Sequence, residues 1–450
     1  MTIGDSLHPR SLTRTCRVNL INPPSAPGTT ANREGAAGMG VVYPHEGAFL
    51  YPPHTLATVA ASLRDAGYEV QASDAVIEGL PPDVAKADAI GVFVSYASLD
   101  TDLAFLAALR SQTSARLMAL GPAMRFVGEQ VLDRAPVDAV LVGEAEAFFA
   151  AGLRHLDEEG GSPSARLLTP EVVHASGYDT QGLIQDLDAL PFPAWEQLRH
   201  EKYGLLTVLT SRGCPDQCAY CPYAAAQGHR LRARSVENVL AELAWLDRRF
   251  HPARLVFRDP VFAYNRDRVV EICTGMIRHE LHLRWECESR PEHFDADLLR
   301  LMQRAGCTWV KIGLETTNEA LLQKLKRVAS AREAVQYAQR VADVVRTCSD
   351  LGLYIRLFVM AGLPGQDVAA AQSTRHFVEQ LGPTALNIKL YEKYPGIQLD
   401  SSADRDHEAQ MEVLCQAQAT LQGRHSSPSL LARSRRLLRS AWRGGKHGQQ

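Results

Sequence analysis

The chain has 450 residues, of which 46% are hydrophobic, and its formal net charge is −3. This length can bury a large core and predicts two domains, while the nearly neutral charge gives no reason to expect nucleic-acid binding. No run approaches the roughly 20 apolar residues of a membrane helix, the polar start lacks a signal core, and the nine cysteines are too scattered for a secreted disulfide framework. We therefore expect a cytoplasmic protein without stable membrane insertion.

Strands and helices alternate in the first part of the chain, after an N-terminal tail at residues 1–16. Five parallel strands with intervening helices predict a doubly wound α/β domain over residues 17–157. The expected strands are residues 17–22, 69–74, 89–95, 116–121 and 138–143, and helical patterns cover 55–66, 99–111 and the segment from 144 onward.

Ligands of such sheets lie beyond the carboxyl ends of the strands. Ordinary strand-to-helix turns are the alternative at each of these ends. The candidate cofactor contacts are Asp74, Ser95, Gly121, Gly143 and Glu144.

Residues 158–200 are predicted to connect the domains, because they contain a glycine- and serine-rich stretch and a proline-punctuated one. Residues 201–400 then repeat a strand-helix unit six times, which favours a partial, open β/α barrel. The expected strands are 205–210, 254–258, 283–288, 309–314, 353–360 and 385–391, and the helices are 235–250, 266–280, 295–305, 331–350 and 366–381.

Three cysteines follow the first strand of this barrel. Cys214, Cys218 and Cys221 are spaced C-x3-C-x2-C, and three thiolates leave one iron of a 4Fe–4S cluster without a protein ligand. That iron could bind a small molecule. Structural zinc is one alternative, although no second ligand pair follows. A four-ligand cluster for electron transfer or sensing is another, although no well-spaced fourth cysteine is found. The three cysteines are the candidate metal ligands and catalytic residues.

This loop, with Tyr220 before its third cysteine, resembles the signature of the radical S-adenosylmethionine (SAM) superfamily. The strings Tyr51-Pro52-Pro53-His54-Thr55-Leu56-Ala57 and Val142-Gly143-Glu144-Ala145-Glu146 resemble the cobalamin-binding, flavodoxin-like domain that precedes the barrel in many of these enzymes. The motif Asp-x-His-x-x-Gly, whose histidine binds cobalt in other cobalamin domains, is missing, since Val76 stands at the nearest match. The resemblance implies a 4Fe–4S cluster, SAM and cobalamin as cofactors.

The resemblance also implies cofactor contacts at the ends of the barrel strands. Glu288 and Arg290 could hold the ribose and the methionine carboxylate, and Glu315 is similar to the family's Gly-x-Glu strand end. Asp259 suits the methionine ammonium, although a helix-capping aspartate would have the same sequence. Gly362 and Gly365 could let the backbone approach the adenine.

The family's commonest activity is methylation of an unactivated carbon. One SAM would charge the corrin to methylcobalamin, and a second would be cleaved at the cluster to the radical that removes a substrate hydrogen. The resemblance therefore implies a methyltransferase for a small-molecule intermediate of natural-product or antibiotic biosynthesis, with a low-potential electron donor such as flavodoxin or ferredoxin. A non-methylating rearrangement, cyclisation or oxidation is the alternative.

For two further regions, the sequence supports only general expectations. Residues 385–396 place Tyr391, Tyr394, Lys389 and Lys393 where they could contact substrate, with solvated strand ends as the alternative. Residues 401–450 are predicted to form a basic C-terminal tail.

Overall fold

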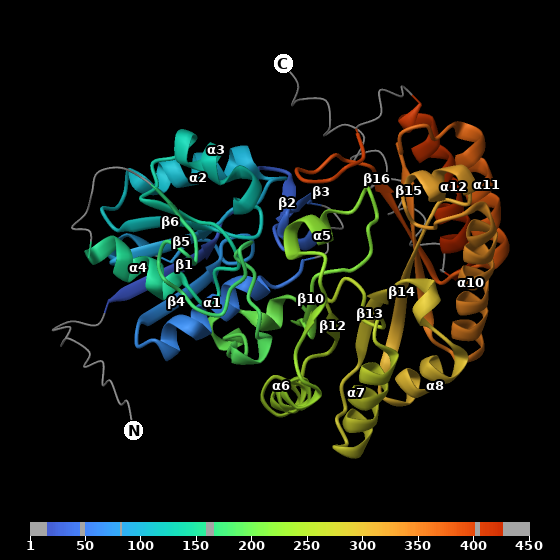
Figure 1. Cartoon of the computed structure of the whole chain (residues 1–450), viewed down its shortest axis with the longest axis horizontal. Coiled ribbons are helices and arrows are strands. Elements are labelled where there is room, and N and C mark those ends of the chain that lie inside the picture. The colour runs from blue at the N-terminus through green and yellow to red at the C-terminus, as the bar shows by residue number, and fades with distance from the viewer. Residues whose placement is uncertain (1–15, 46–49, 82, 159–165, 401–405, 426–450) are drawn as a thin grey trace.

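Two parallel six-stranded sheets organise the chain, and Figure 1 shows their two α/β units side by side. The computed structural model describes residues 16–45, 50–81, 83–158, 166–400 and 406–425. The predicted N-terminal tail, apart from Cys16, and most of the predicted basic tail lie outside the described residues. No helix in the described part of the chain is long and apolar enough to span a membrane.

The first sheet confirms the doubly wound, flavodoxin-like prediction. Its order is β4-β1-β5-β6-β7-β8, with every neighbouring pair parallel. The last strand lies inside the segment predicted as a connector and adds to the five expected strands. The bounds are β1 Arg17–Asn22, β4 Glu69–Asp74, β5 Ala89–Phe93, β6 Arg116–Leu120, β7 Ala139–Leu141 and β8 Arg166–Leu168.

Helices cover both faces of this sheet. The apolar sides of α1 (His54–Asp65) and α4 (Phe149–Glu158) pack in one core cluster, and those of α2 (Leu99–Arg110) and α3 (Met124–Arg134) pack in another. Two details differ from the sequence-based expectation. The helix α3 was not predicted, and α4 begins at Phe149 rather than directly after the strand, because residues 145–148 form a turn.

A short hairpin that the sequence did not predict lies across the carboxyl ends of these strands. It consists of β2 (Thr29–Asn32), the 3-10 turn η1 (Ala36–Gly38) and β3 (Val41–Pro44). Gly40 has a φ of 89°, and a Cβ there would come within 2.4 Å of Ser95 Oγ. Glycine is therefore needed for the hairpin to approach the end of β5 so closely.

The connector joins the two units through buried contacts. Its 3-10 turns are η3 (Leu187–Ala189), η4 (Trp195–Gln197) and η5 (His200–Lys202). Trp195 is fully buried and its ring lies edge-on to His54, with 5.6 Å between the ring centroids. Because one hydrophobic cluster contains residues of both units, their packing forms one continuous core.

The second sheet has the sequential order β16-β15-β14-β13-β12-β9, all parallel, which confirms the partial (β/α)6 barrel. Its strands are β9 Leu206–Val208, β12 Leu255–Phe257, β13 Trp285–Ser289, β14 Cys307–Glu315, β15 Tyr354–Ala361 and β16 Ala385–Leu390. Its helices are α6 Val236–Arg249, α7 Arg266–Arg278, α8 Ala296–Arg304, α9 Glu319–Lys324, α10 Ala331–Asp350 and α11 Val368–Leu381, with the 3-10 turn η6 at Pro291–His293.

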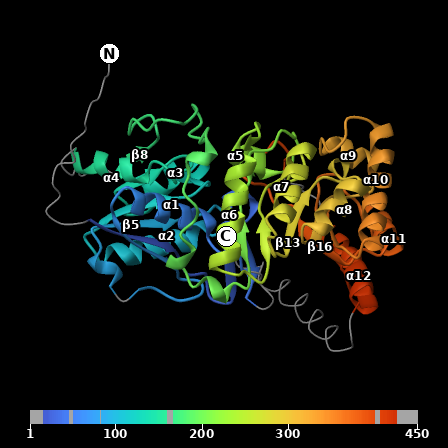
Figure 2. The ribbon, with the colours of Figure 1, turned by 90° about the horizontal axis from the view of Figure 1, so that it is seen from below.

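A short ribbon and two further helices complete this unit. The two-stranded ribbon of β10 (Ser211–Arg212) and β11 (Arg232–Ala233) encloses the short helix α5 (Pro222–Gln227), which lies between the two units in Figure 1. A long helix, α12 (His407–His425), lies within residues 401–450 and packs against α11 and β16, as Figure 2 also shows.

Candidate active site

The cysteine loop lies between β10 and α5, at the carboxyl end of β9. Its backbone is held from outside the loop: Cys214 N donates to Gly228 O at 3.0 Å, and Ala219 N donates to Leu325 O at 2.9 Å. Gly213, just before the first cysteine, has a φ of 82°, and a Cβ there would lie 2.1 Å from Arg230 O. The tight turn into the loop therefore requires glycine.

The three thiols line one cavity. Burial, with Asp216 nearby, raises the pKa of Cys214 to about 12. Burial and the neighbouring Cys218 raise the pKa of Cys221 as well. The apoprotein would hold these two as thiols at neutral pH, so metal ions must supply the positive charge that makes them thiolates.

The spacing of these sulfurs bears on which metal group fits. A zinc ion holds its sulfur ligands about 2.3 Å from a single point. Among the residues described, no three His, Cys, Asp or Glu side chains are grouped so that they could hold one metal ion. A cubane cluster binds each thiolate at a different iron, so its three sulfurs need not converge on one point.

Two guanidinium groups lie beside the middle cysteine. Arg327 Nη1 is 3.7 Å and Arg290 Nη1 is 3.9 Å from Cys218 Sγ. Arg290 also pairs with Asp216 at 3.0 Å and with Glu292 at 2.7 Å. These two cations place positive charge where a thiolate and its cluster would be negative.

Arg327 is a site residue that the sequence did not reveal. It follows α9 within Lys324-Leu325-Lys326-Arg327, which reads as a solvated basic stretch, yet its side chain is only 7% exposed. Its Nε donates to Tyr337 Oη at 2.8 Å, and its Nη2 donates to Gly313 O at 3.2 Å. No local pattern signals this position, because long-range packing against α10 and β14 creates it.

The predicted Gly-x-Glu strand end has a structural explanation. Glu315 has a φ of 62°, and its carboxylate folds back over β14, so that a Cβ on Gly313 would lie 2.0 Å from Glu315 Oε1. Tyr220 Oη donates to this oxygen at 2.9 Å, and Arg327 lies 3.9 Å from it. Burial raises the pKa of Glu315, although Arg327 and Tyr220 oppose that rise. A left-handed, non-glycine residue with a buried carboxylate is often found at functional sites.

The other predicted barrel residues fall into two groups. Asp259, Glu288 and Arg290 line the same cavity as the cysteines, whereas Gly362 and Gly365 are not among its lining residues. Asp259 already accepts hydrogen bonds from Thr210 N, Thr210 Oγ1 and Ser211 Oγ at 2.6–3.1 Å, so it shapes the turn between β9 and β10. The cofactor roles of all five residues stay predictions.

The cavity has a volume of about 2020 Å³, which exceeds the roughly 300–1,000 Å³ of an ordinary ligand pocket. Its walls come from both units. The first contributes Asn32, Gly35, Ala36, Val41 and Tyr43 of the hairpin and Tyr51, and these small, polar and aromatic residues include no histidine. A space of this size would have room for a cluster, SAM and a corrin together.

The predicted strand-end residues of the first unit lie in other surroundings. Asp74 accepts from Asn22 Nδ2 at 2.8 Å and from Tyr203 Oη at 2.6 Å. Ser95 N donates to Asp102, which pairs with the buried Arg33 of the hairpin at 2.5 Å. The hairpin and its polar network thus cover these two ends, and their predicted cofactor contacts are not tested.

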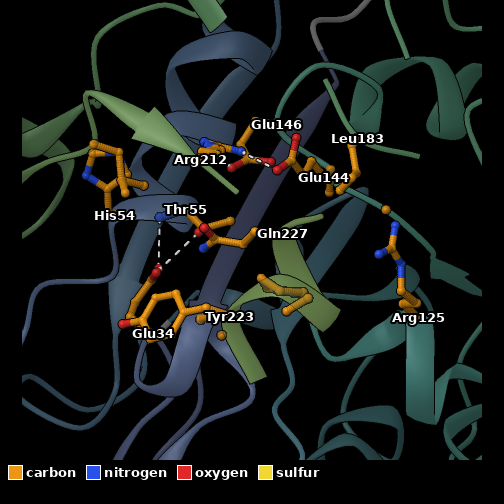
Figure 3. A pocket seen from close by; sticks show the side chains of 18 of the residues that line it. Glu34, His54, Thr55, Arg125, Glu144, Glu146, Leu183, Arg212, Tyr223 and Gln227 are labelled. Atoms are coloured by element: carbon orange, nitrogen blue, oxygen red, sulfur yellow. Dashed lines mark hydrogen bonds and ion pairs between the residues drawn. The ribbon is translucent and has the colours of Figure 1, made fainter. Parts of the chain in front are cut away.

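Gly121, Gly143 and Glu144 instead line a second, small cavity of about 40 Å³ (Figure 3). Its walls also include Arg212, Tyr223 and Gln227 of the second unit. Such a volume holds a few water molecules but not a corrin. A corrin bound to this conformation would therefore have to occupy the large cavity.

Beside this small cavity, four buried charged residues join the two units. We call Glu144, Glu146, Arg212 and Arg232 the interdomain ion cluster. Arg232 donates to both oxygens of Glu144 at 2.7 and 2.8 Å. Arg212 reaches Glu144 at 3.3 Å and Glu146 at 2.8 Å (Figure 3). Because Arg212 lies two residues before Cys214, the cysteine loop is tied directly to the carboxyl end of β7.

Comparison with known proteins agrees with this arrangement. Residues 208–378 match the radical SAM superfamily. An uncharacterized methyltransferase of Pyrococcus horikoshii is 25% identical over 364 residues, which cover 77% of each chain. The cytidylyl-2-hydroxyethylphosphonate methyltransferase of Streptomyces wedmorensis is 24% identical over 400 residues, which cover 73% of each chain.

Among solved structures, the radical SAM methyltransferase TsrM from Kitasatospora setae, with cobalamin and a [4Fe-4S] cluster bound, superposes with a TM-score of 0.64 at 16% identity. The match covers 86% of this chain and 77% of that one. The two-domain fold of that enzyme is therefore present here, as the sequence predicted.

Proposed function

We propose that this chain, which carries a radical SAM domain at residues 208–378, is a cobalamin-dependent methyltransferase that acts on an unactivated carbon of a small molecule. The observation that carries the proposal is the shared cavity of about 2020 Å³. Three thiols, which would leave one vertex of a bound cluster free, line it together with residues of the first unit's hairpin. The methyltransferase names of the relatives support the choice of reaction.

Each cofactor would have a distinct role in this cavity. A bound 4Fe–4S cluster supplies one electron to SAM, and a bound corrin supplies a methyl carrier. Cys214, Cys218 and Cys221 would hold the cluster. Arg290 and Arg327 would balance its charge and receive the methionine carboxylate, since both guanidiniums lie within 4 Å of Cys218 Sγ.

The partners and setting follow from the same chemistry. We propose that electrons come from a low-potential protein such as flavodoxin or ferredoxin, because cleavage needs one electron at a time. We also propose that the protein acts in the cytoplasm, where thiols stay reduced, and that the substrate is an intermediate of natural-product biosynthesis.

Methyl-labelled SAM tests the reaction. Anaerobically reconstituted enzyme is incubated with cobalamin, reductant, labelled SAM and substrates suggested by neighbouring genes. Label in the product together with 5′-deoxyadenosine is the expected result. Unlabelled product with 5′-deoxyadenosine would instead establish a rearrangement, cyclisation or oxidation. Absence of 5′-deoxyadenosine under strong reductant would contradict radical chemistry altogether.

Tyr220→Phe is expected to raise the KM for SAM about threefold to tenfold. The hydroxyl donates to Glu315 Oε1 at 2.9 Å, so its loss frees a carboxylate that is predicted to contact the cofactor. The measurement is 5′-deoxyadenosine formation against SAM concentration. Tyr264→Phe is the matched control, since Tyr264 is 44% exposed and should keep the wild-type KM. A wild-type KM for Tyr220→Phe would remove Glu315 from the SAM site.

A further inference from the structure

Charged side chains cross the barrel interior at one level, on adjacent strands. Glu288 of β13 is the register partner of Lys311 of β14, and Lys311 is the partner of Arg356 of β15. Val256 of β12 is the register partner of Glu286. Arg258, two residues after Val256, therefore lies level with Glu288, two residues after Glu286. All four side chains line the large cavity. Lys389 of β16 lines it as well, four residues beyond this level, because its register partner is Met360.

The cations of this layer outnumber their partners. Lys311 pairs with Glu286 at 3.0 Å. Within the described residues, Arg258, Arg356 and Lys389 form no ion pair. Arg356 stacks 4.9 Å from the Trp309 ring, and its Nε is buried without a hydrogen-bond acceptor.

Arg258 and Lys389 likewise have no carboxylate within ion-pair distance among the described residues, although Arg258 Nη2 donates to the backbone oxygen of Glu34. Arg258 lies 4.5 Å from the Tyr51 ring, and its Nη1 is buried without an acceptor. Lys389 Nζ lies 3.3 Å from Tyr43 Oη. A buried donor without an acceptor costs stability, so both orphaned guanidinium nitrogens are positioned for an acceptor that the protein does not supply.

Carboxylates elsewhere do not cancel this charge. Four cations, Arg258, Lys311, Arg356 and Lys389, face two carboxylates on the inner strands, Glu286 and Glu288, which leaves an excess of two positive charges there. The buried carboxylates Asp259 and Glu315 also line the cavity, but Asp259 accepts from Thr210 and Ser211, and Glu315 accepts from Tyr220. Glu392, Asp406, Glu408 and Glu412 also line the cavity, but all four are exposed, so water and salt screen them. The inner layer is therefore short of negative charge.

We propose that this layer binds an acidic group of the methyl-accepting substrate, a carboxylate, phosphate or phosphonate, with Arg258 and Arg356 as specificity residues. The proposal rests on the proposed function. The acidic group would be separate from the SAM carboxylate, because Arg290 and Arg327 lie next to Cys218, nearer the carboxyl ends of the strands. Guanidinium forks suit such oxyanions, which accept two parallel hydrogen bonds.

Succinate and its uncharged diamide, succinamide, are matched probes of this site. Calorimetric titration of the cluster-reconstituted enzyme, with SAM present and at low salt, should show succinate binding at least about tenfold tighter than succinamide. Arg356→Gln should weaken succinate binding about tenfold. Lys389→Gln, a less disruptive change in the same cavity, should weaken it severalfold. Glu288→Gln should strengthen it, because it removes the opposing charge.

Arg346→Gln is the control for net charge, since it removes one arginine from the exposed face of α10, where the side chain is 62% exposed. It should leave succinate binding as in the wild type. Equal affinity for the two probes, or wild-type succinate affinity in both Arg356→Gln and Lys389→Gln, would overturn the proposal. A raised KM for SAM in Arg356→Gln would assign the anion to the SAM carboxylate and would also overturn it. Probe binding is measured without turnover. If methyl transfer were not observed, the binding results would still test whether this layer binds an acidic group.

Discussion

Cys218→Ala is expected to lose the cluster and to lower 5′-deoxyadenosine formation at least about 100-fold. Changes to groups that merely orient a metal ligand cost about 10- to 100-fold, so the loss of a ligand itself should cost more. Cys218 should show the largest effect of the three cysteines, because both guanidiniums approach its sulfur and each would lose that negative neighbour. Iron and sulfide content, the electron paramagnetic resonance of the reduced protein and SAM cleavage are the measurements.

The control for this experiment is Cys348→Ala. Cys348 is fully buried on α10 and outside the lining of the cavity, so its loss should destabilise the fold at least as much while the cluster stays. A cluster that survives Cys218→Ala with full cleavage activity would show that another group holds that iron. A single tightly bound zinc ion in the wild type would restore the alternative left open by the spacing alone.

Periodicity was sufficient for most of the fold. The pattern at residues 331–350 coincides with α10, and all six expected barrel strands are present within a few residues of their predicted ends. Long amphipathic helices and buried apolar strands carry their signal locally, so tertiary context changes only their boundaries.

The missed elements lack such a local signal. The strands of the hairpin at residues 29–44 have four residues each, and η1 between them has positive φ values at Ala36 and Ala37. Their formation depends on Arg33 reaching Asp102 across 69 residues. The three-residue β8 pairs only with β7 at the sheet edge. Such segments are ordered by distant partners that propensity cannot reveal.

The candidate site also contains residues that the sequence could predict and residues that it could not. The cysteine spacing and the Gly-x-Glu strand end were readable because each is a local motif with one geometry. The role of Glu144 was not, since its partners lie at residues 184, 212 and 232. Polar residues at strand ends can be listed from sequence, but their division among the large cavity, the small cavity and the buried networks depends on the packing of two domains.

Glu144→Gln is expected to lower the free energy of unfolding by about 3 kcal/mol. The substitution leaves Arg232, whose side chain is 4% exposed, without its bidentate partner, and removing one member of a buried ion pair costs about 3–5 kcal/mol. Urea unfolding is the measurement. Glu196→Gln, which breaks the more exposed pair with Arg64, should cost less than about 1 kcal/mol. Equal losses in the two variants would contradict a structural role for the interdomain ion cluster.

The effect of Glu144→Gln should also depend on pH. Burial alone would raise the pKa of Glu144, but Arg212 and Arg232 outweigh it and lower the pKa. A lowered pKa means that the carboxylate's contribution is complete above its unfolded-state pKa of about 4.3 and is lost as the pH falls through the lower folded value. The difference between wild type and variant should therefore be largest near neutral pH and shrink in acid. A difference that grows below pH 4 would refute this assignment of charge.

The same variant should separate cofactor cleavage from methyl transfer. The ion cluster holds Arg212, and with it the start of the cysteine loop, against the carboxyl end of β7. Loss of that restraint should let the distance between the two units vary, while the three cysteines keep their own loop geometry. At a pH and temperature where the variant stays folded, we expect near-normal cluster content but fewer methylated products per 5′-deoxyadenosine. Transfer requires the two cofactors to face one substrate at a fixed distance, whereas cleavage requires only one of them. In the double variant Glu144→Gln with Arg212→Gln, the loss of methylated product per 5′-deoxyadenosine should be smaller than the sum of the two single losses, because both substitutions break the same contact.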